Sequence, residues 1–103
     1  DLAAEFADGG SPVVLDVRRN QERAEQHIAG SLHIPIHEVL QRVDEVPAGP
    51  VWVHCAGGYR AGVVAALLDA RGIDVVAIDD SFDNAGPAGL YLTSDATKQE
   101  IPA

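Results

Sequence analysis

The chain has 103 residues, of which 47% are hydrophobic, and it carries a formal net charge of −9. This length fits one compact domain, and this hydrophobic fraction excludes a disordered chain. The charge comes from 16 acidic and 7 basic residues, which argues against nucleic acids and anionic membranes as partners. No apolar run approaches the roughly 18 to 20 residues that a membrane span needs.

Helices and strands are predicted to alternate along the chain. In chain order they are a helix at 2–7, a strand at 13–17, a helix at 21–26, a strand at 32–34, a helix at 37–46, a strand at 51–54, a helix at 60–71 and a strand at 75–78. The three main strands (13–17, 51–54 and 75–78) are short, continuous and β-branched, as in strands that are buried on both faces of a parallel sheet. This alternation predicts an α/β sandwich.

Two of these helices have distinct patterns. The helix at 37–46 is predicted from Val39, Leu40, Val43 and Val46, which would share one face at helical spacing. The helix at 60–71 is apolar nearly all round and is followed by Gly72, a natural helix end. We assign residues 1–92 to one domain and 93–103 to a polar C-terminal tail.

The chain has a single cysteine, Cys55, and therefore no internal disulfide. It lacks the cysteine density of a small secreted scaffold, which favours a reducing, cytoplasmic setting. The chain begins at Asp1 and enters a helical pattern at once, so we interpret it as part of a longer protein.

Cys55 directly follows the strand at 51–54, and the loop Ala56-Gly57-Gly58-Tyr59 leads from it to Arg60. In open parallel sheets, ligands bind outside the carboxyl ends of the strands. Two glycines let backbone amides turn inward, and amides at a helix N-terminus favour an anion. A thiol there is expected to ionise and to act as a nucleophile in sulfur exchange. An inert core cysteine is the alternative, and it fits this position less well.

Arg60 is predicted to bind an anion. A cation in the first turn of a helix opposes the helix dipole, so its position favours a nearby negative charge. The alternative is a plain surface residue.

Three separated segments of the chain carry recognisable motifs: residues 15–18 (LDVR), residues 27–35 (HIAGSLHIP) and residues 53–61 (VHCAGGYRA). Together, these three segments resemble the rhodanese family. The resemblance implies a rhodanese-like three-layer sandwich, with a central parallel sheet flanked by helices. It also implies transfer of sulfane sulfur from thiosulfate or a low-molecular-weight persulfide to a thiophilic acceptor, with no cofactor.

The same resemblance assigns the site residues. Cys55 would carry the sulfur as a persulfide, and Asp16 and Arg18 would support the site. The substrate would be cradled by the loop residues Ala56, Gly57, Gly58, Tyr59 and Arg60. The sequence departs from the family where Gln26 and the pair Asp80-Ser81 replace the usual glycines, and where Ala85 lies near the place of a common tryptophan.

Other functions fit less well. Related phosphatases and arsenate reductases use a Cys-x5-Arg loop, whereas this chain has Cys-x4-Arg, a tighter cradle suited to a sulfane sulfur. A non-catalytic or regulatory rhodanese module that binds a partner domain is the alternative, although such modules often lack the cysteine. A fused or partner sulfur-metabolism domain, such as a metallo-β-lactamase-fold persulfide dioxygenase, is a third interpretation.

The histidines are not expected to act in catalysis or metal binding. His54 precedes Cys55 on a strand, where neighbouring side chains point to opposite faces, so we interpret it as a satisfied core histidine. His33 and His37 have the spacing of a helical metal pair, but Pro35 between them breaks that helix. We predict no metal site.

Overall fold

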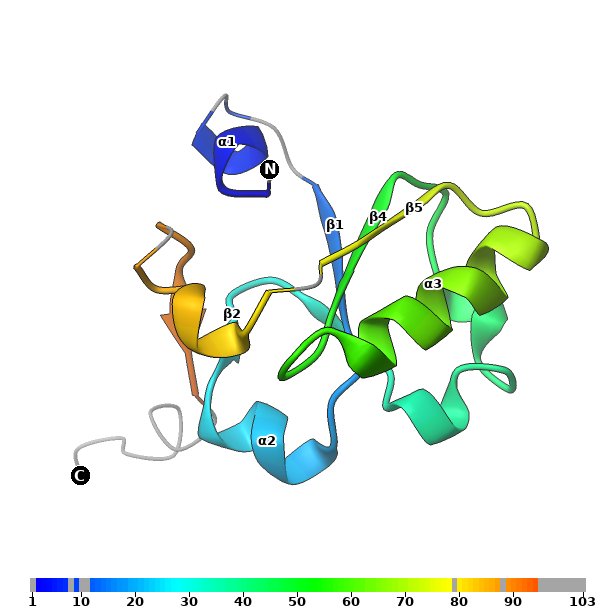
Figure 1. The fold of residues 1–103 in the computed structure, drawn as a ribbon, viewed down its shortest axis with the longest axis horizontal. Helices are drawn as coiled ribbons and strands as arrows, with labels where there is room; N and C mark the ends of the chain where they lie inside the picture. The colour runs from blue at the N-terminus through cyan, green and yellow to red at the C-terminus, as the bar shows by residue number, and fades with distance from the viewer. Residues whose placement is uncertain (1, 8, 10–11, 79, 88, 95–103) are drawn as a thin grey trace, which may run out of the picture.

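A four-stranded parallel sheet forms the centre of the domain (Figure 1). The computed structural model describes residues 2–7, 9, 12–78, 80–87 and 89–94. The sheet comprises β1 (Val13–Asp16), β3 (Leu32–His33), β4 (Val51–His54) and β5 (Val75–Ala77), in the order β3-β1-β4-β5. A separate antiparallel pair is formed by β2 (His27–Ile28) and β6 (Leu92–Thr93).

Helices and short turns cover the sheet. The α-helices are α1 (Leu2–Ala7), α2 (Asn20–Glu25) and α3 (Tyr59–Ala70), and the 3-10 turns are η1 (Ile36–Glu38), η2 (Val43–Glu45) and η3 (Phe82–Asn84). Leu15, Val53 and Val64 belong to one apolar core, between the sheet and α3. Leu2 of α1, Val14 and Ile28 form a second core on the opposite face of β1, and Figure 1 shows α1 and α3 well apart. The predicted α/β fold with a central parallel sheet is thus confirmed.

The predicted helix at 37–46 is wrong. Two 3-10 turns, η1 and η2, replace it, and Leu40, which was expected on the buried face, is 56% exposed. Val39 and Val46 still reach the core, each from its own turn. These two valines are therefore buried without a continuous helix. β-branched residues such as valine have a low helix propensity, which is consistent with the two separate turns.

β5 also differs from its prediction. It was expected to be buried on both faces, but Val76 is 37% exposed. The reason is that β5 lies at the end of the strand order, beside β4 alone.

The described helices include none long and apolar enough to cross a membrane. Thr93, assigned to the tail, pairs with His27 through β6, while residues 95–103 lie outside the described residues.

Candidate active site

The sulfur atom of Cys55 lies in a cradle of backbone amides. Cys55 follows β4 and is 2% exposed. Its Sγ accepts hydrogen bonds from the N–H groups of Gly58, at 3.0 Å, and Ala61, at 3.3 Å. Gly58 immediately precedes α3 and Ala61 lies in its first turn, where the amides of a helix are free of intrahelical partners. The site therefore offers N–H groups and the positive end of a helix dipole to a thiolate or persulfide.

Gly58 makes this cradle possible. It is the residue that precedes α3, and its φ of 101° and ψ of −21° lie in the left-handed region. A residue with a Cβ adopts that conformation only with strain, so glycine is the residue that suits this turn.

The other predicted loop residues lie in different environments. Gly57 is exposed and Ala56 is half-buried. Tyr59 is 84% exposed, so most of its side chain lies outside the buried cradle. Ala56 is tied to the C-terminal part of the domain, because its carbonyl accepts the N–H of Phe82 at 2.8 Å.

Arg60 forms a two-point ion pair with Glu22 of α2. Its Nη1 and Nη2 atoms donate to Glu22 Oε1 at 2.8 Å and to Oε2 at 3.0 Å. The hydrogen bonds from Arg60 lower the pKa of Glu22 to about 2. The pKa of Arg60 is raised in turn, first by Glu22 and to a smaller degree by Cys55. The anion expected beside Arg60 is thus supplied by the chain itself.

Asp16 and Arg18 form a buried pair beside the carboxyl end of β4. Arg18 Nε and Nη2 each donate to an Asp16 carboxylate oxygen at 3.0 Å, and Nη2 also donates to the Gln26 carbonyl at 2.6 Å. Burial alone would raise the pKa of Asp16, but the hydrogen bonds and the positive charge of Arg18 outweigh it and keep that pKa below its ordinary value. The Arg18 guanidinium also lies over the Phe82 ring, 3.9 Å from its centre.

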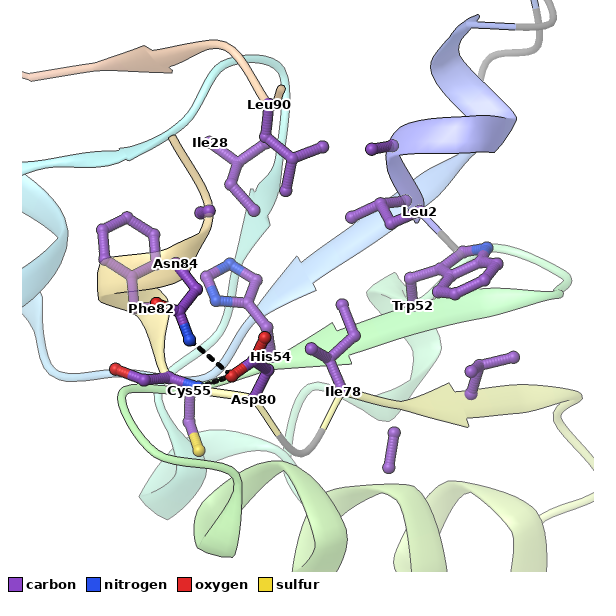
Figure 2. A pocket seen from close by; sticks show the side chains of 15 residues that line it. Leu2, Ile28, Trp52, His54, Cys55, Ile78, Asp80, Phe82, Asn84 and Leu90 are labelled. Atoms are coloured by element: carbon purple, nitrogen blue, oxygen red, sulfur yellow. Dashed lines mark hydrogen bonds between the residues drawn. The ribbon is translucent and has the colours of Figure 1, made fainter. Parts of the chain in front are cut away.

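His54 and Cys55 point to opposite faces of the sheet, as expected from strand geometry. Figure 2 shows the His54 ring in a pocket, with Cys55 Sγ directed away from it toward α3. The pocket has a volume of about 310 Å³ and is lined mainly by apolar residues, among them Leu2, Trp52, Ile78 and Leu90. His54 stacks on Phe82, with ring centres 5.6 Å apart.

His54 is a core histidine, but not a satisfied one. It is 3% exposed, and neither ring nitrogen has a hydrogen-bond partner of good geometry among the described residues. Burial lowers the pKa of His54 to about 4, against the opposing attraction of Asp16. The imidazole is therefore neutral at neutral pH.

Asp80 and Ser81, which replace the expected glycines, organise the turn η3. Asp80 Oδ1 accepts the Ser81 N–H at 2.8 Å and the Asn84 side-chain amide at 2.7 Å, as dashed lines in Figure 2 mark. Ser81 Oγ in turn accepts the Asp83 N–H at 3.2 Å. This departure from the family pattern thus supplies side-chain caps where glycines would offer flexibility.

Sequence reasoning missed Glu22 and Phe82. Glu22 lies 38 positions before its partner Arg60, so no local spacing connects them. The only available signal was its place as an acidic residue near the start of a predicted helix, which is common on protein surfaces.

Comparison with known proteins places this chain in a family. The rhodanese-like domain family matches residues 1–85. The chain belongs to this family. Its structure is similar to that of a rhodanese-like domain protein from Staphylococcus aureus, with a TM-score of 0.77 and 26% sequence identity. The similarity covers 90% of this chain and 92% of the other.

Two curated proteins share part of their length with this rhodanese-like domain. A putative sulfur carrier protein, YrkF, of Bacillus subtilis is 33% identical over 61% of the chain. An HTH-type transcriptional regulator, Rv0324, of Mycobacterium tuberculosis is 30% identical over 86% of the chain. The chain spans only 35% and 41% of these relatives, respectively.

Proposed function

We propose that this rhodanese-like domain is a sulfurtransferase that carries sulfane sulfur on Cys55. The observation that supports this proposal most directly is the pair of N–H groups on Sγ, since the same groups can stabilise a thiolate before transfer and a persulfide after it. The similarity to a putative sulfur carrier protein supports the same role.

The reaction has two displacement steps. The Cys55 thiolate attacks the sulfane sulfur of thiosulfate or of a low-molecular-weight persulfide, and the S–S bond of the donor breaks. Sulfite or a thiolate leaves with the electron pair, and Cys55 becomes a persulfide. A thiophilic acceptor, such as a thiolate or cyanide, then attacks the outer sulfur and releases the Cys55 thiolate.

The remaining site residues have proposed roles in this reaction. The loop from Ala56 to Arg60 would bind the donor, and Asp16 with Arg18 would hold the ends of β1 and β4 in place. We place the reaction in a reducing, cytoplasmic setting. Because the curated relatives are longer than this chain, we also propose a fused or partner domain that supplies or consumes the sulfur.

Intact-mass measurement tests the proposal. After incubation with thiosulfate or glutathione persulfide, the protein should gain the mass of one sulfur atom, and cyanide should remove it. Cys55→Ser should stay unloaded, lose thiosulfate:cyanide sulfur transfer and keep its fold by circular dichroism. Appreciable transfer by a folded Cys55→Ser protein would show that the sulfur is carried elsewhere.

A regulatory module is the second candidate function. It is favoured by the similarity to a transcriptional regulator over most of the chain. The same measurement separates the two functions, because a module without sulfur-transfer activity would gain no sulfur from either donor.

A further inference from the structure

The charge on Arg60 is already engaged within the chain. Both terminal nitrogens of its guanidinium donate to the Glu22 carboxylate, and the two side chains are only 24% and 31% exposed. This pair occupies the edge of the planar guanidinium that carries the two terminal nitrogens. A bound oxyanion would otherwise accept hydrogen bonds from the same edge.

Glu22 is itself held in position. Its Oε1 accepts the backbone N–H of Arg19 at 2.8 Å, which fixes the carboxylate at the start of α2. Competition by a substrate anion for Arg60 would therefore have to break an ordered contact, not displace a freely rotating side chain.

Carboxylates also predominate beside the loop. The hollow next to Ala56 is lined by three of them, from Glu22, Glu25 and Asp83. The cation in the same hollow is Arg18, which is paired with Asp16. Arg19 shares a neighbouring hollow with Glu22, Glu25 and Arg60, where two cations face two carboxylates. A donor that approaches Cys55 along this side meets no net positive charge among the described side chains.

We propose that Glu22 is a specificity-determining residue that selects donors by charge. By occupying Arg60, it favours a donor with a single negative charge, such as an alkyl persulfide or a thiosulfonate, over the doubly charged thiosulfate. Glu22 is a positioning residue in this scheme, since it acts through Arg60. The inference rests on the proposed sulfur transfer and narrows its substrate class.

Two donors that differ mainly in charge test this inference. Thiosulfate reacts with the Cys55 thiolate to give the persulfide and sulfite, whereas methanethiosulfonate gives the same persulfide and methanesulfinate. In each case the S–S bond of the donor breaks and its electron pair leaves with the oxidised sulfur. The measured quantity is kcat/KM for each donor, with cyanide as the acceptor.

Glu22→Gln is the decisive variant, because glutamine can still accept the Arg19 N–H while it releases Arg60 from its counter-charge. We expect kcat/KM for thiosulfate to rise by roughly tenfold, the value of about one charge-assisted hydrogen bond, and that for methanethiosulfonate to rise much less. The gain should shrink as salt is added, because the freed charge is partly exposed. It should disappear in the Glu22→Gln/Arg60→Ala double variant.

Glu25→Gln is the matched control. It removes the same charge from the same helix, three positions later, and Glu25 is exposed and is not in contact with Arg60 through any ion pair seen in the described residues. Glu25→Gln should leave the ratio of the two donors nearly unchanged. An equal gain in Glu25→Gln, or an unchanged ratio in folded Glu22→Gln, would overturn the role of Glu22.

The single variant Arg60→Ala gives a second measurement if Glu22→Gln does not fold. It leaves the Glu22 carboxylate unpaired, so thiosulfate should lose more activity than methanethiosulfonate, and equal losses would contradict the inference. Sulfur loading of the wild-type protein is checked by intact mass with both donors. Failure to load from either donor overturns the proposed function, whereas normal loading with an unchanged donor ratio overturns only the inference about Glu22.

Discussion

At the scale of single residues, the site depends on backbone groups more than on side chains. Both N–H donors to Cys55 Sγ come from the main chain, at Gly58 and Ala61. Their positions are set by the conformation of the loop and not by a rotamer. Substitutions that keep this conformation should therefore be tolerated, whereas those that alter it should affect sulfur transfer directly.

Gly58→Ala and Gly57→Ala form a matched pair that tests this dependence. Gly58 has a φ of 101°, so an alanine there should cost about 1–2 kcal/mol of stability and displace the N–H that faces Sγ. A Cβ at Gly57 would meet no atom within 4 Å beyond its chain neighbours, so that variant should keep nearly full stability and the N–H groups that face Sγ. Thermal unfolding and thiosulfate:cyanide kinetics on both variants check this prediction, and similar behaviour of the two would contradict it.

Arg60→Ala is expected to affect substrate binding more than stability. The ion pair that it removes is partly exposed, and such pairs contribute at most about 1 kcal/mol. Its melting temperature should therefore fall by only a few degrees, while its KM for thiosulfate rises severalfold because Glu22 is left without a counter-charge. If the variant unfolds many degrees early and its thiosulfate kinetics are unchanged, Arg60 is part of the scaffold instead.

At the scale of elements, the site is one unit formed by β4, the loop and α3. β4 places Cys55 at its carboxyl end, and α3 begins only four residues later, at Tyr59. The short connection allows the amides of the loop and of the first helical turn to reach the same sulfur atom. We therefore expect the length of this loop to matter for sulfur transfer, as the Cys-x4-Arg spacing predicts.

Insertion of one alanine after Gly58 tests the importance of loop length. The insertion should separate the two N–H donors on Sγ and lower sulfur transfer at least tenfold, because the stabilisation of the thiolate is lost. The longer loop would also match the Cys-x5-Arg spacing of phosphatases, so weak hydrolysis of an aryl phosphate is expected. The unaltered protein is the control, and robust phosphatase activity in it would show that our interpretation of loop size is wrong.

At the scale of the whole molecule, the second core contains a polar group that affects stability. His54 lies with Phe82 in the pocket behind the sheet and stays neutral because burial lowers its pKa to about 4. In the unfolded chain the same group titrates near pH 6.5. Between these values the unfolded state binds more protons than the folded state, so stability increases with pH in that window.

The free energy of unfolding should therefore decrease as the pH falls from about 6.5 to 4. The shift of His54 corresponds to a loss of about 3 kcal/mol, and above pH 6.5 its contribution is fully present. The carboxylates with lowered pKa, Asp16, Glu22 and Glu45, act at lower pH, below their ordinary values. His54→Phe keeps an aromatic ring against Phe82 and should lack this part of the decrease. Urea unfolding at several pH values measures both proteins, and parallel curves would contradict the assignment to His54.

The sequence by itself determined the α/β class, the main strands and the position of Cys55 at the end of one of them. These features follow from short-range signals: β-branched runs bounded by turn residues, glycines beside the cysteine, and an apolar stretch that ends at Gly72. Helix α3 and strand β4 match their predicted bounds to within one residue because each has both a strong pattern and a clear end.

Only the tertiary structure decided the features that depend on distant neighbours. The segment 36–46 forms two turns because Val39 and Val46 can both reach the core that way, which periodicity alone did not show. The exposure of β5 follows from its place in the strand order. The pairing of Glu22 with Arg60, across 38 positions, brings together two surface-type residues whose meeting depends on how α2 and α3 pack. The local sequence determines which secondary structure each segment prefers, whereas the contacts between distant segments are determined by the packing of the whole domain.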